Sequence, residues 1–291
     1  MQIDASMVIL YALAASVGWG AADFWGGIYA RDTPVFVVIA VSQAISLIVL
    51  VPIMVAHGVP LPDDPRLLLA CAAGVAATAE LGLIYFALSR GDAFVTAPVA
   101  AVGAAMAVAI GLIGGDRLDL TIALGLLAAL LGGGACAWTS RHSHDKHGFL
   151  RNAAICVGAA AGVAFAFTCF HSASELDPYW STAALHVSMV LASAPLMLVG
   201  RGRTLRQRLP GRALLPALAL IGIGDVGGDL AYAAASQHGE LSIVSALASL
   251  YPLTTIALGL VLLRARAGRV QVAGVAIALA GAVLLGFASP H

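Results

Sequence analysis

Apolar stretches of about 20 residues recur along the whole chain, and charged residues, prolines or glycine clusters separate them. A helix rises about 1.5 Å per residue, so each stretch is long enough to cross the hydrocarbon core of a bilayer. The pattern predicts an all-α integral membrane protein with ten membrane-spanning helices. Their expected ranges are 8–30, 34–56, 67–89, 93–114, 120–139, 150–172, 179–200, 213–236, 241–263 and 270–288.

The second five spans repeat features of the first five. The aligned pairs include Gly18 and Gly162, Pro34 and Pro178, and Tyr85 and Tyr232, at shifts of 144 to 147 positions. An odd number of spans in each unit places consecutive copies in opposite orientations, which is the inverted-repeat layout of many secondary transporters. We therefore predict a first five-helix repeat at residues 1–140, a connecting loop at 141–149 and a second five-helix repeat at 150–291.

Composition and charge agree with a membrane location. Hydrophobic residues make up 60% of the chain and charged residues only 10%, whereas soluble domains carry roughly 25% charged residues. Fifteen basic and fifteen acidic residues give no net charge, so a nucleic-acid partner is not indicated. Thirteen of the fifteen basic residues lie in the loops that follow spans one, three, five, seven and nine. The positive-inside tendency places these loops in the cytoplasm and both termini outside the cell (inner) membrane.

Metal and cofactor sites are not indicated by the sequence. The four cysteines stand singly within apolar segments, without the paired spacing of a zinc site. The loop with His142, His144, Asp145 and His147 joins the two repeats, and its spacing matches no specific metal site. We interpret this loop as a solvated linker and expect no cofactor.

Acidic residues inside the predicted spans are the main candidates for function. Asp23 lies in the run GWGAADFWGG, and Asp225 and Asp229 lie one helical turn apart in span eight. A charge near the centre of a membrane helix costs roughly 2.5–3.5 kcal/mol on insertion scales, so such acids normally face a cavity or a partner. Asp225, Asp229, Tyr232 and Ser236 share one helix face. The repeat partners of this face in span three are Thr78, Gly82, Tyr85 and Ser89. Glu80 lies off that face, and its role stays open.

The remaining polar groups favour particular spans. Span nine carries Ser242, Ser245 and Ser249, followed by Tyr251-Pro252, and one face of span seven carries Thr182, His186, Met189 and Ser193. Spans five and ten lack charged and hydroxyl side chains over 122–138 and 272–287. We expect these two spans at the periphery, against lipid or against a second subunit of a homodimer, and we expect spans one, three, four, six, eight and nine to line a cavity.

Several segments together resemble the EamA-type branch of the drug/metabolite transporter superfamily. They are GWGAADFWGG in span one, GDRL before span five, and SIVSALASLYPLTTIALG followed by QVAGVAIALAGAVLLG near the end of the chain. Members usually carry Gly-Glu-Arg at the start of the last helix of each half. Here Asp116 stands in place of the glutamate in the first copy, and Ala265 stands in its place in the second. The resemblance implies transport and leaves the cargo open, with bacterial aromatic amino acid exporters among the similar proteins.

Our leading hypothesis is a secondary active transporter, an exporter of a small metabolite, working by alternating access between the two repeats. Amino acids, including aromatic ones, are the first guess for the cargo. Acids would bind its ammonium group or exchange protons, and aromatic side chains would contact a ring. The candidate residues for substrate binding or proton coupling are Trp19, Asp23, Tyr85, Phe167, His171, Asp225, Asp229, Tyr232, Ser245, Ser249 and Tyr251.

Two alternatives stay open at this point. An exporter of organic cations or drugs would use the same acids and aromatic rings. An integral membrane enzyme would need a nucleophile and a base at membrane depth, and the serines of span nine with His171 or His186 are the only candidates, without a defined catalytic spacing. We therefore expect a transporter and not an enzyme.

Overall fold

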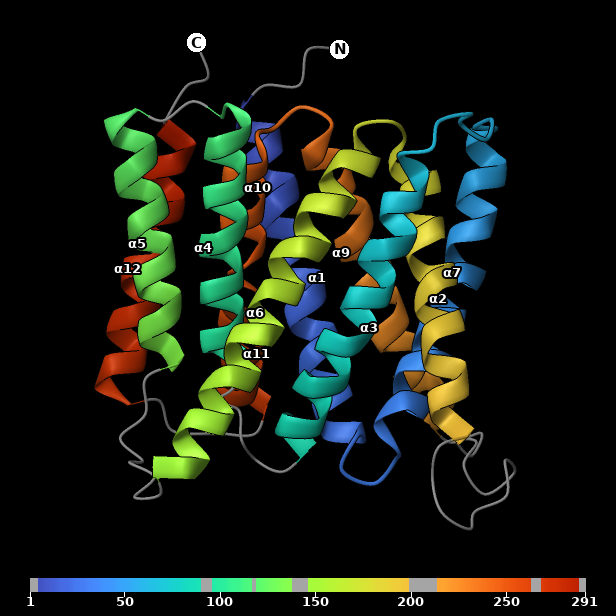
Figure 1. The fold of residues 1–291 in the computed structure, drawn as a ribbon, viewed down its shortest axis with the longest axis horizontal. Coiled ribbons are helices and arrows are strands. Elements are labelled where there is room, and N and C mark those ends of the chain that lie inside the picture. The colour runs from blue at the N-terminus through green and yellow to red at the C-terminus, as the bar shows by residue number, and fades with distance from the viewer. Residues whose placement is uncertain are drawn as a thin grey trace.

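The protein is a bundle of long helices, here described from a computed structural model (Figure 1). The structure describes residues 5–89, 96–116, 119–137, 146–198, 214–262 and 268–287. Within these ranges every regular element is an α-helix. The helices are α1 (Ala5–Tyr29), α2 (Val35–His57), α3 (Leu67–Ser89), α4 (Thr96–Gly114), α5 (Leu120–Ala137), α6 (Lys146–Ser174), α7 (Pro178–Leu198), α9 (Leu215–Ser236), α10 (Leu241–Ala248), α11 (Tyr251–Leu262) and α12 (Arg269–Phe287).

Six of the described segments are long and apolar enough to cross a membrane. They are Ser6–Tyr29, Val35–His57, Leu67–Phe86, Pro178–Met197, Leu215–Ser236 and Leu241–Leu262. Three shorter apolar helices lie at Gly103–Gly114, Leu120–Gly132 and Ala160–Ser174. The all-helical membrane architecture is therefore as predicted, whereas ten spans stay a prediction.

Helices from the two halves of the chain interleave. Helix α1 packs on α9 while α6 packs on α3, and α2 packs on α9 while α7 packs on α3. Helices α5 and α12 form an extensive pair at one end of the bundle, and α2 and α7 pack together at the other end (Figure 1). Each helix thus has its main neighbours in the opposite half, so neither half forms a core by itself.

The start of α1 and the end of α12 lie at the same edge of the bundle (Figure 1). Most of the basic residues on which the orientation was predicted lie outside the described residues, among them Arg90, Arg141, the 201–212 cluster and Arg264. The side chains of the His142–His147 loop lie outside them too. The orientation relative to the cytoplasm therefore stays a prediction.

The α5 and α12 pair presents a broad apolar surface. Leu120 is 76% exposed, Leu131 is 60% exposed, and Val272 is 58% exposed. Exposed apolar side chains are stable in contact with lipid or with another apolar helix. The lack of polar residues in these two helices is consistent with their place at the end of the bundle.

The predicted span 241–263 is interrupted. Helix α10 ends at Ala248 and α11 begins at Tyr251, with Pro252 in the first turn of α11. The continuous span that we predicted differs from the structure here, because proline has no N–H for the helix ladder and its ring clashes with the preceding turn. The Ser249 and Leu250 N–H groups bond to the Ser245 and Leu247 carbonyls. The break matters because Tyr251 lies at the cavity described below.

Aspartates define several helix starts. The carboxylates of Asp119 and Asp177 accept hydrogen bonds from the N–H groups of Ile122 and Trp180, each at 2.7 Å, at the starts of α5 and α7. Asp116 acts across the halves, because its Oδ2 accepts the Ser242 N–H of α10 at 2.8 Å. The acid of the GDRL segment therefore supports a helix end, and that helix belongs to the second half of the chain.

We expect Asp116→Ala to destabilise the protein by about 1 kcal/mol, because the first turn of α10 loses its carboxylate acceptor. The unfolding free energy can be measured by SDS titration in mixed micelles. Asp63→Ala, which changes an exposed acid in the loop before α3, is the control and should stay within about 0.5 kcal/mol of the wild type. Equal effects of the two substitutions would contradict a capping role for Asp116.

Candidate substrate cavity

A cavity of about 70 Å³ lies between helices from both halves of the chain. Helices α1, α3, α6, α7, α9 and α11 contribute to its wall. The lining residues are Trp19, Asp23, Ala77, Glu80, Leu81, Ala166, Phe167, Phe170, Leu185, Met189, Asp225, Asp229 and Tyr251. Pockets between helices of a membrane bundle are the usual place for a transported molecule.

Carboxylates dominate the polar part of this wall. Asp23, Glu80, Asp225 and Asp229 all line the cavity, and no Lys or Arg is among the lining residues that the structure describes. Asp23, Asp225 and Asp229 are at most 7% exposed. Tyr251 Oη donates a hydrogen bond to Glu80 Oε1 at 3.4 Å. A wall of this kind favours a positively charged group in the cavity, because acids buried without counterions are costly.

Aromatic rings form the other main part of the wall. The Trp19 ring stacks on Phe167 with centroids 5.6 Å apart and meets Tyr251 edge-on at 6.4 Å. Tyr232 packs behind this layer against Trp19 and Phe170, at 5.4 Å and 5.5 Å. Ring faces carry negative charge density, so they suit a flat apolar group or a cation equally well.

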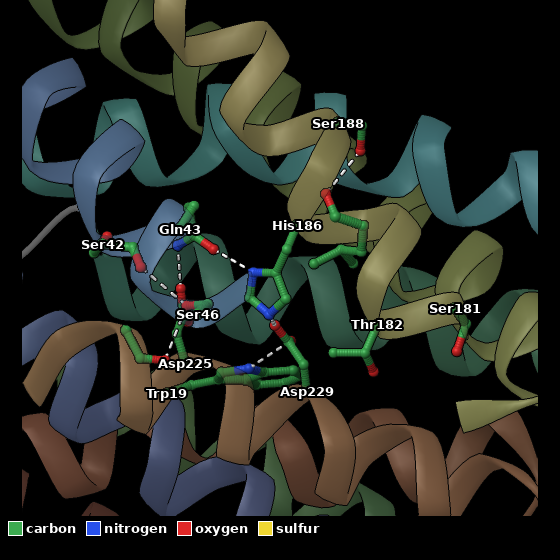
Figure 2. Close-up of polar contacts among 12 residues, drawn as sticks. Trp19, Ser42, Gln43, Ser46, Ser181, Thr182, His186, Ser188, Asp225 and Asp229 are labelled. Atoms are coloured by element: carbon green, nitrogen blue, oxygen red, sulfur yellow. Dashed lines mark hydrogen bonds and ion pairs between the residues drawn. The ribbon is translucent and has the colours of Figure 1, made fainter. Parts of the chain in front are cut away.

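The two acids of α9 are joined through side chains from other helices (Figure 2). Trp19 Nε1 donates a hydrogen bond to Asp229 Oδ1 at 2.9 Å, and His186 Nε2 lies 3.1 Å from Asp229 Oδ2. His186 Nδ1 contacts Gln43 Oε1, and Gln43 Nε2 donates a hydrogen bond to Asp225 Oδ2. The side chains of Gln43 and His186 are fully buried. The result is a continuous polar chain from Trp19 to Asp225 at membrane depth.

A glycine of α9 brings Gln43 to Asp225. A Cβ atom at Gly222 would lie 2.5 Å from the Ser42 carbonyl oxygen, so α2 approaches α9 this closely only because Gly222 has no side chain. Ser46 Oγ donates a hydrogen bond to the Gly222 carbonyl oxygen at 2.9 Å and fixes the register of the two helices. Asp225 lies about one turn further along α9, opposite Gln43.

A second close contact brings Trp19 to Asp229. A Cβ atom at Gly18 would lie 2.6 Å from the Gly224 carbonyl oxygen, and one at Gly228 would lie 2.6 Å from Cδ1 of Trp19. Helices α1 and α9 therefore meet backbone to backbone, and the indole lies across Gly228 with its N–H toward Asp229. The glycines of the segment IGIGDVGGD place the partners of both aspartates.

The structure brings together six of the eleven candidate residues. Trp19, Asp23, Phe167, Asp225, Asp229 and Tyr251 all line the cavity. The other five are not among the described residues that line the cavity. These are Tyr85, His171, Tyr232, Ser245 and Ser249.

Tyr232 and Ser245 contact each other behind the wall. Tyr232 Oη donates a hydrogen bond to the Phe167 carbonyl oxygen at 3.2 Å and lies 3.1 Å from Ser245 Oγ. Ser249 Oγ donates to the Ala246 carbonyl oxygen of its own helix. The hydroxyl groups of Tyr232 and Ser245 therefore tie α9, α6 and α10 together. Their position favours a structural role.

Tyr85 and His171 lie away from the cavity wall. The Tyr85 ring is fully buried against Gly26, where a Cβ atom would come within 2.2 Å of the ring, and its hydroxyl has no hydrogen-bond partner among the described residues. His171 lies 3.8 Å from Glu175 and packs edge-on against Tyr232. Neither side chain is placed to contact a molecule in the cavity.

Sequence reasoning left the role of Glu80 open and missed Phe170 and Gln43. Glu80 lines the cavity. Thr78, which belongs to the face that the repeat indicated, instead donates a hydrogen bond from its hydroxyl to the Gly74 carbonyl oxygen of its own helix. Gln43 was detectable as the single amide side chain within the apolar range 34–56. His186 was noted on one face of span seven and is now the central residue of the polar chain.

The set of lining helices also differs from the prediction in one place. Helix α7 lines the cavity with Leu185 and Met189, whereas α4 contributes no side chain among those that the structure describes. Helix α4 packs on α5, α6 and α10, and its neighbours α6 and α11 supply wall residues in its place.

Metal-binding clusters are not found among the described residues, where no group of three His, Cys, Asp or Glu side chains is close enough to hold an ion. The serines of span nine bond largely to neighbouring backbone or to Tyr232, and none forms a hydrogen bond with His186 or His171 in the described part of the chain.

Comparison with known proteins agrees with these features. The sequence matches the EamA-like transporter family twice, over residues 6–133 and 152–287. A solved crystal structure superposes on the chain with a TM-score of 0.73 at 16% identity, covering 93% of this chain and 95% of the other. That likeness shows a shared fold. No curated protein matches the sequence.

Proposed function

The chain belongs to the EamA-like transporter family, and from this premise we propose that it is a secondary transporter of a small metabolite across the membrane. The proposed mechanism is alternating access, in which the two five-helix halves rock against each other around the cavity. The reciprocal packing of α1 on α9 and of α6 on α3 supports this mechanism, because equivalent helices of the two halves then enclose one site.

The cargo that this cavity suits best carries an ammonium group and an apolar or aromatic part. The single observation behind this proposal is that buried carboxylates and aromatic rings share one small cavity, with Asp23 and Asp225 beside Trp19 and Phe167. The acids would bind the ammonium group, and the rings would contact the apolar part. Export of amino acids, including aromatic ones, fits both requirements.

A second candidate cargo is an organic cation without a carboxylate. The observation that favours it is that the described part of the cavity wall contains no Lys or Arg. An amino acid brings a carboxylate of its own, which needs a positive or hydrogen-bonding partner in the site. An amine makes no such demand.

The finer parts of this proposal follow the sequence. We propose ten spans in two inverted halves at 1–140 and 150–291, joined by the loop 141–149, in the cell membrane with both termini outside. The apolar face of α5 and α12 would contact lipid or the same face of a second copy. We also propose that the protein exports its cargo and that protons are the coupling ion.

We expect purified protein in liposomes to catalyse counterflow of labelled L-phenylalanine or of labelled phenethylamine. The pair differs only in the carboxylate, so a preference for one of them separates the two candidate cargoes. Saturable flux of either compound above that of empty liposomes would support the proposal. No saturable flux of these two, or of a wider panel of amino acids and amines, would contradict it.

Asp225→Asn and Asp23→Asn are each expected to lower this flux at least about tenfold, since a charge-assisted contact is worth roughly 1.5–3 kcal/mol. Initial rates at matched protein levels give the comparison. Asp63→Asn, an exposed loop acid, is the control and should transport at the wild-type rate. Unchanged flux in both cavity variants would remove these acids from cargo binding.

A further inference from the structure

Asp225 and Asp229 are linked by two side chains that come from neither their own helix nor the first helix. Gln43 of α2 contacts Asp225 on one side and His186 of α7 on the other, and His186 continues to Asp229 (Figure 2). Gln43 and His186 are fully buried, and the two aspartates are at most 7% exposed. Buried polar groups at this depth require their hydrogen-bonding partners, so the order of donors and acceptors along the chain is constrained.

The arrangement in the structure has one consistent order. Gln43 Nε2 donates to ionised Asp225, so Gln43 Oε1 is left to accept a hydrogen bond, and His186 must donate from Nδ1. His186 Nε2 then lies 3.1 Å from Asp229 Oδ2, an ion-pair distance without the alignment of a hydrogen bond, and this contact carries one proton. That proton belongs either to a His186 cation beside an ionised carboxylate or to a protonated Asp229 beside a neutral ring.

The opposite order arises when Asp225 takes up the proton. Its O–H donates to Gln43 Oε1 after the amide turns over, and Gln43 Nε2 then donates to His186 Nδ1. His186 carries its proton on Nε2 and donates it to ionised Asp229. Both arrangements hold the same number of protons, because one proton has left the Asp229 end and one has appeared on Asp225.

We propose that Gln43 and His186 form a hydrogen-bond relay that couples the protonation of Asp225 to that of Asp229. The proton itself passes between the two acids by way of the cavity that both line. In the relay the amide of Gln43 and the tautomer of His186 switch together and report which acid is protonated. The role of this shared proton as the coupling ion rests on the proposed transport function. The relay itself does not, because it follows from the donor and acceptor order alone.

The surroundings of Asp225 give the relay a connection to the cargo. Asp225 lines the cavity and interacts electrostatically with Asp23 of α1 and with Glu80 and Tyr85 of α3. Tyr251 of α11 also faces this region, where it hydrogen-bonds Glu80. A cation that enters among these acids stabilises ionised Asp225 and so holds the shared proton at the Asp229 end. Cargo binding and protonation of Asp225 therefore exclude each other.

The decisive experiment reads the tautomer of His186 by ¹⁵N NMR of histidine-labelled protein in lipid nanodiscs, without any cargo. The signals of His186 are assigned by their loss in His186→Gln. We expect a protonated Nδ1 in the wild type near neutral pH. In Asp225→Asn, whose amide can donate like a protonated acid, we expect Nδ1 to move from the protonated to the unprotonated range.

The variant Gln43→Leu separates a relay from a direct effect. With the amide removed, Asp225→Asn should no longer change the Nδ1 signal of His186, and Gln43→Met provides the same test if the leucine variant does not fold. Ser42→Ala is the matched control, because Ser42 is the neighbouring residue and its hydroxyl bonds within α2, to the Ile39 carbonyl oxygen. An Nδ1 signal that ignores Asp225→Asn, or that still responds without Gln43, would overturn the relay.

Transport measurements then test the coupling role with labelled L-phenylalanine and phenethylamine. A pH gradient should drive accumulation in the wild type, and Gln43→Leu should lose this accumulation while counterflow without a gradient persists. Accumulation that is equal in both proteins would overturn coupling through Gln43. Absence of any flux in the wild type would instead count against the proposed function, and the NMR result would still decide the relay.

Discussion

Replacing His186 with leucine is expected to lower the free energy of unfolding by about 3 kcal/mol. His186 is fully buried and lies 3.1 Å from Asp229 Oδ2. Without the ring, Asp229 keeps only the hydrogen bond from Trp19 Nε1. A buried carboxylate that loses its partner carries an uncompensated desolvation cost, and this cost is larger than the pair's own net contribution to stability. SDS titration in mixed micelles measures the change.

A double-variant cycle identifies the origin of that loss. Asp229→Asn removes the charge but keeps an oxygen that can accept from Trp19, so His186→Leu should cost less in an Asp229→Asn background. We expect the two effects to differ from additivity by about 1–3 kcal/mol. Thr182→Val is the control on the same face of α7, since the Thr182 hydroxyl bonds within its own helix at 2.7 Å. Strict additivity would mean that His186 acts through packing alone.

The substitution Gly18→Ala is expected to destabilise the protein by about 1–3 kcal/mol, near the upper end of that range. The added Cβ atom would lie 2.6 Å from the Gly224 carbonyl oxygen and 2.9 Å from Gly228 Cα, and both are backbone atoms that cannot turn aside. Relief requires α1 and α9 to separate. Separation lengthens the Trp19 to Asp229 hydrogen bond, so transport should fall together with stability.

Gly162→Ala is the matched control, because Gly162 holds the position of Gly18 in the second half of the sequence. A Cβ atom at Gly162 would meet no atom within 4 Å. Alanine is favoured over glycine in a helix interior by about 0.5–1 kcal/mol, so this substitution should be neutral or stabilising. Similar losses in both variants would show that the close contact at Gly18 is not the cause.

The pair Gly18 and Gly162 also shows how far the sequence repeat could be used. The repeat correctly indicated related helices, and the apolar pattern correctly indicated a helical membrane protein. The repeat also implied that aligned positions make equivalent helix contacts in the two halves, and in this respect the structure differs. Gly18 is a backbone contact point and Gly162 is not, because α9 presents Gly224 and Gly228 to α1, whereas α3 carries Ala77 and Leu81 at the aligned positions.

The candidate site was predictable only where its residues lie on one face of a single helix, because their spacing in the sequence then shows that they belong together. Asp225 and Asp229 share a face at a spacing of four residues, and both line the cavity. The face of α3 was inferred from the repeat partners Thr78 and Tyr85, but these are engaged within the bundle and Glu80 reaches the cavity instead. The link from Asp229 to Gln43 depends on the approach of α2 and α7, which no periodicity within a single span encodes.

The contact between Trp19 and Asp229 has a consequence for the order of synthesis. The two residues are 210 positions apart, so at about 5–20 residues per second α9 follows α1 out of the ribosome after roughly 10–40 s. Until then Asp23 and the indole of Trp19 have none of their partners from the second half. During this interval these side chains need water or the insertion machinery as a substitute partner. The acidic cavity forms only after the helices of the second half have been inserted.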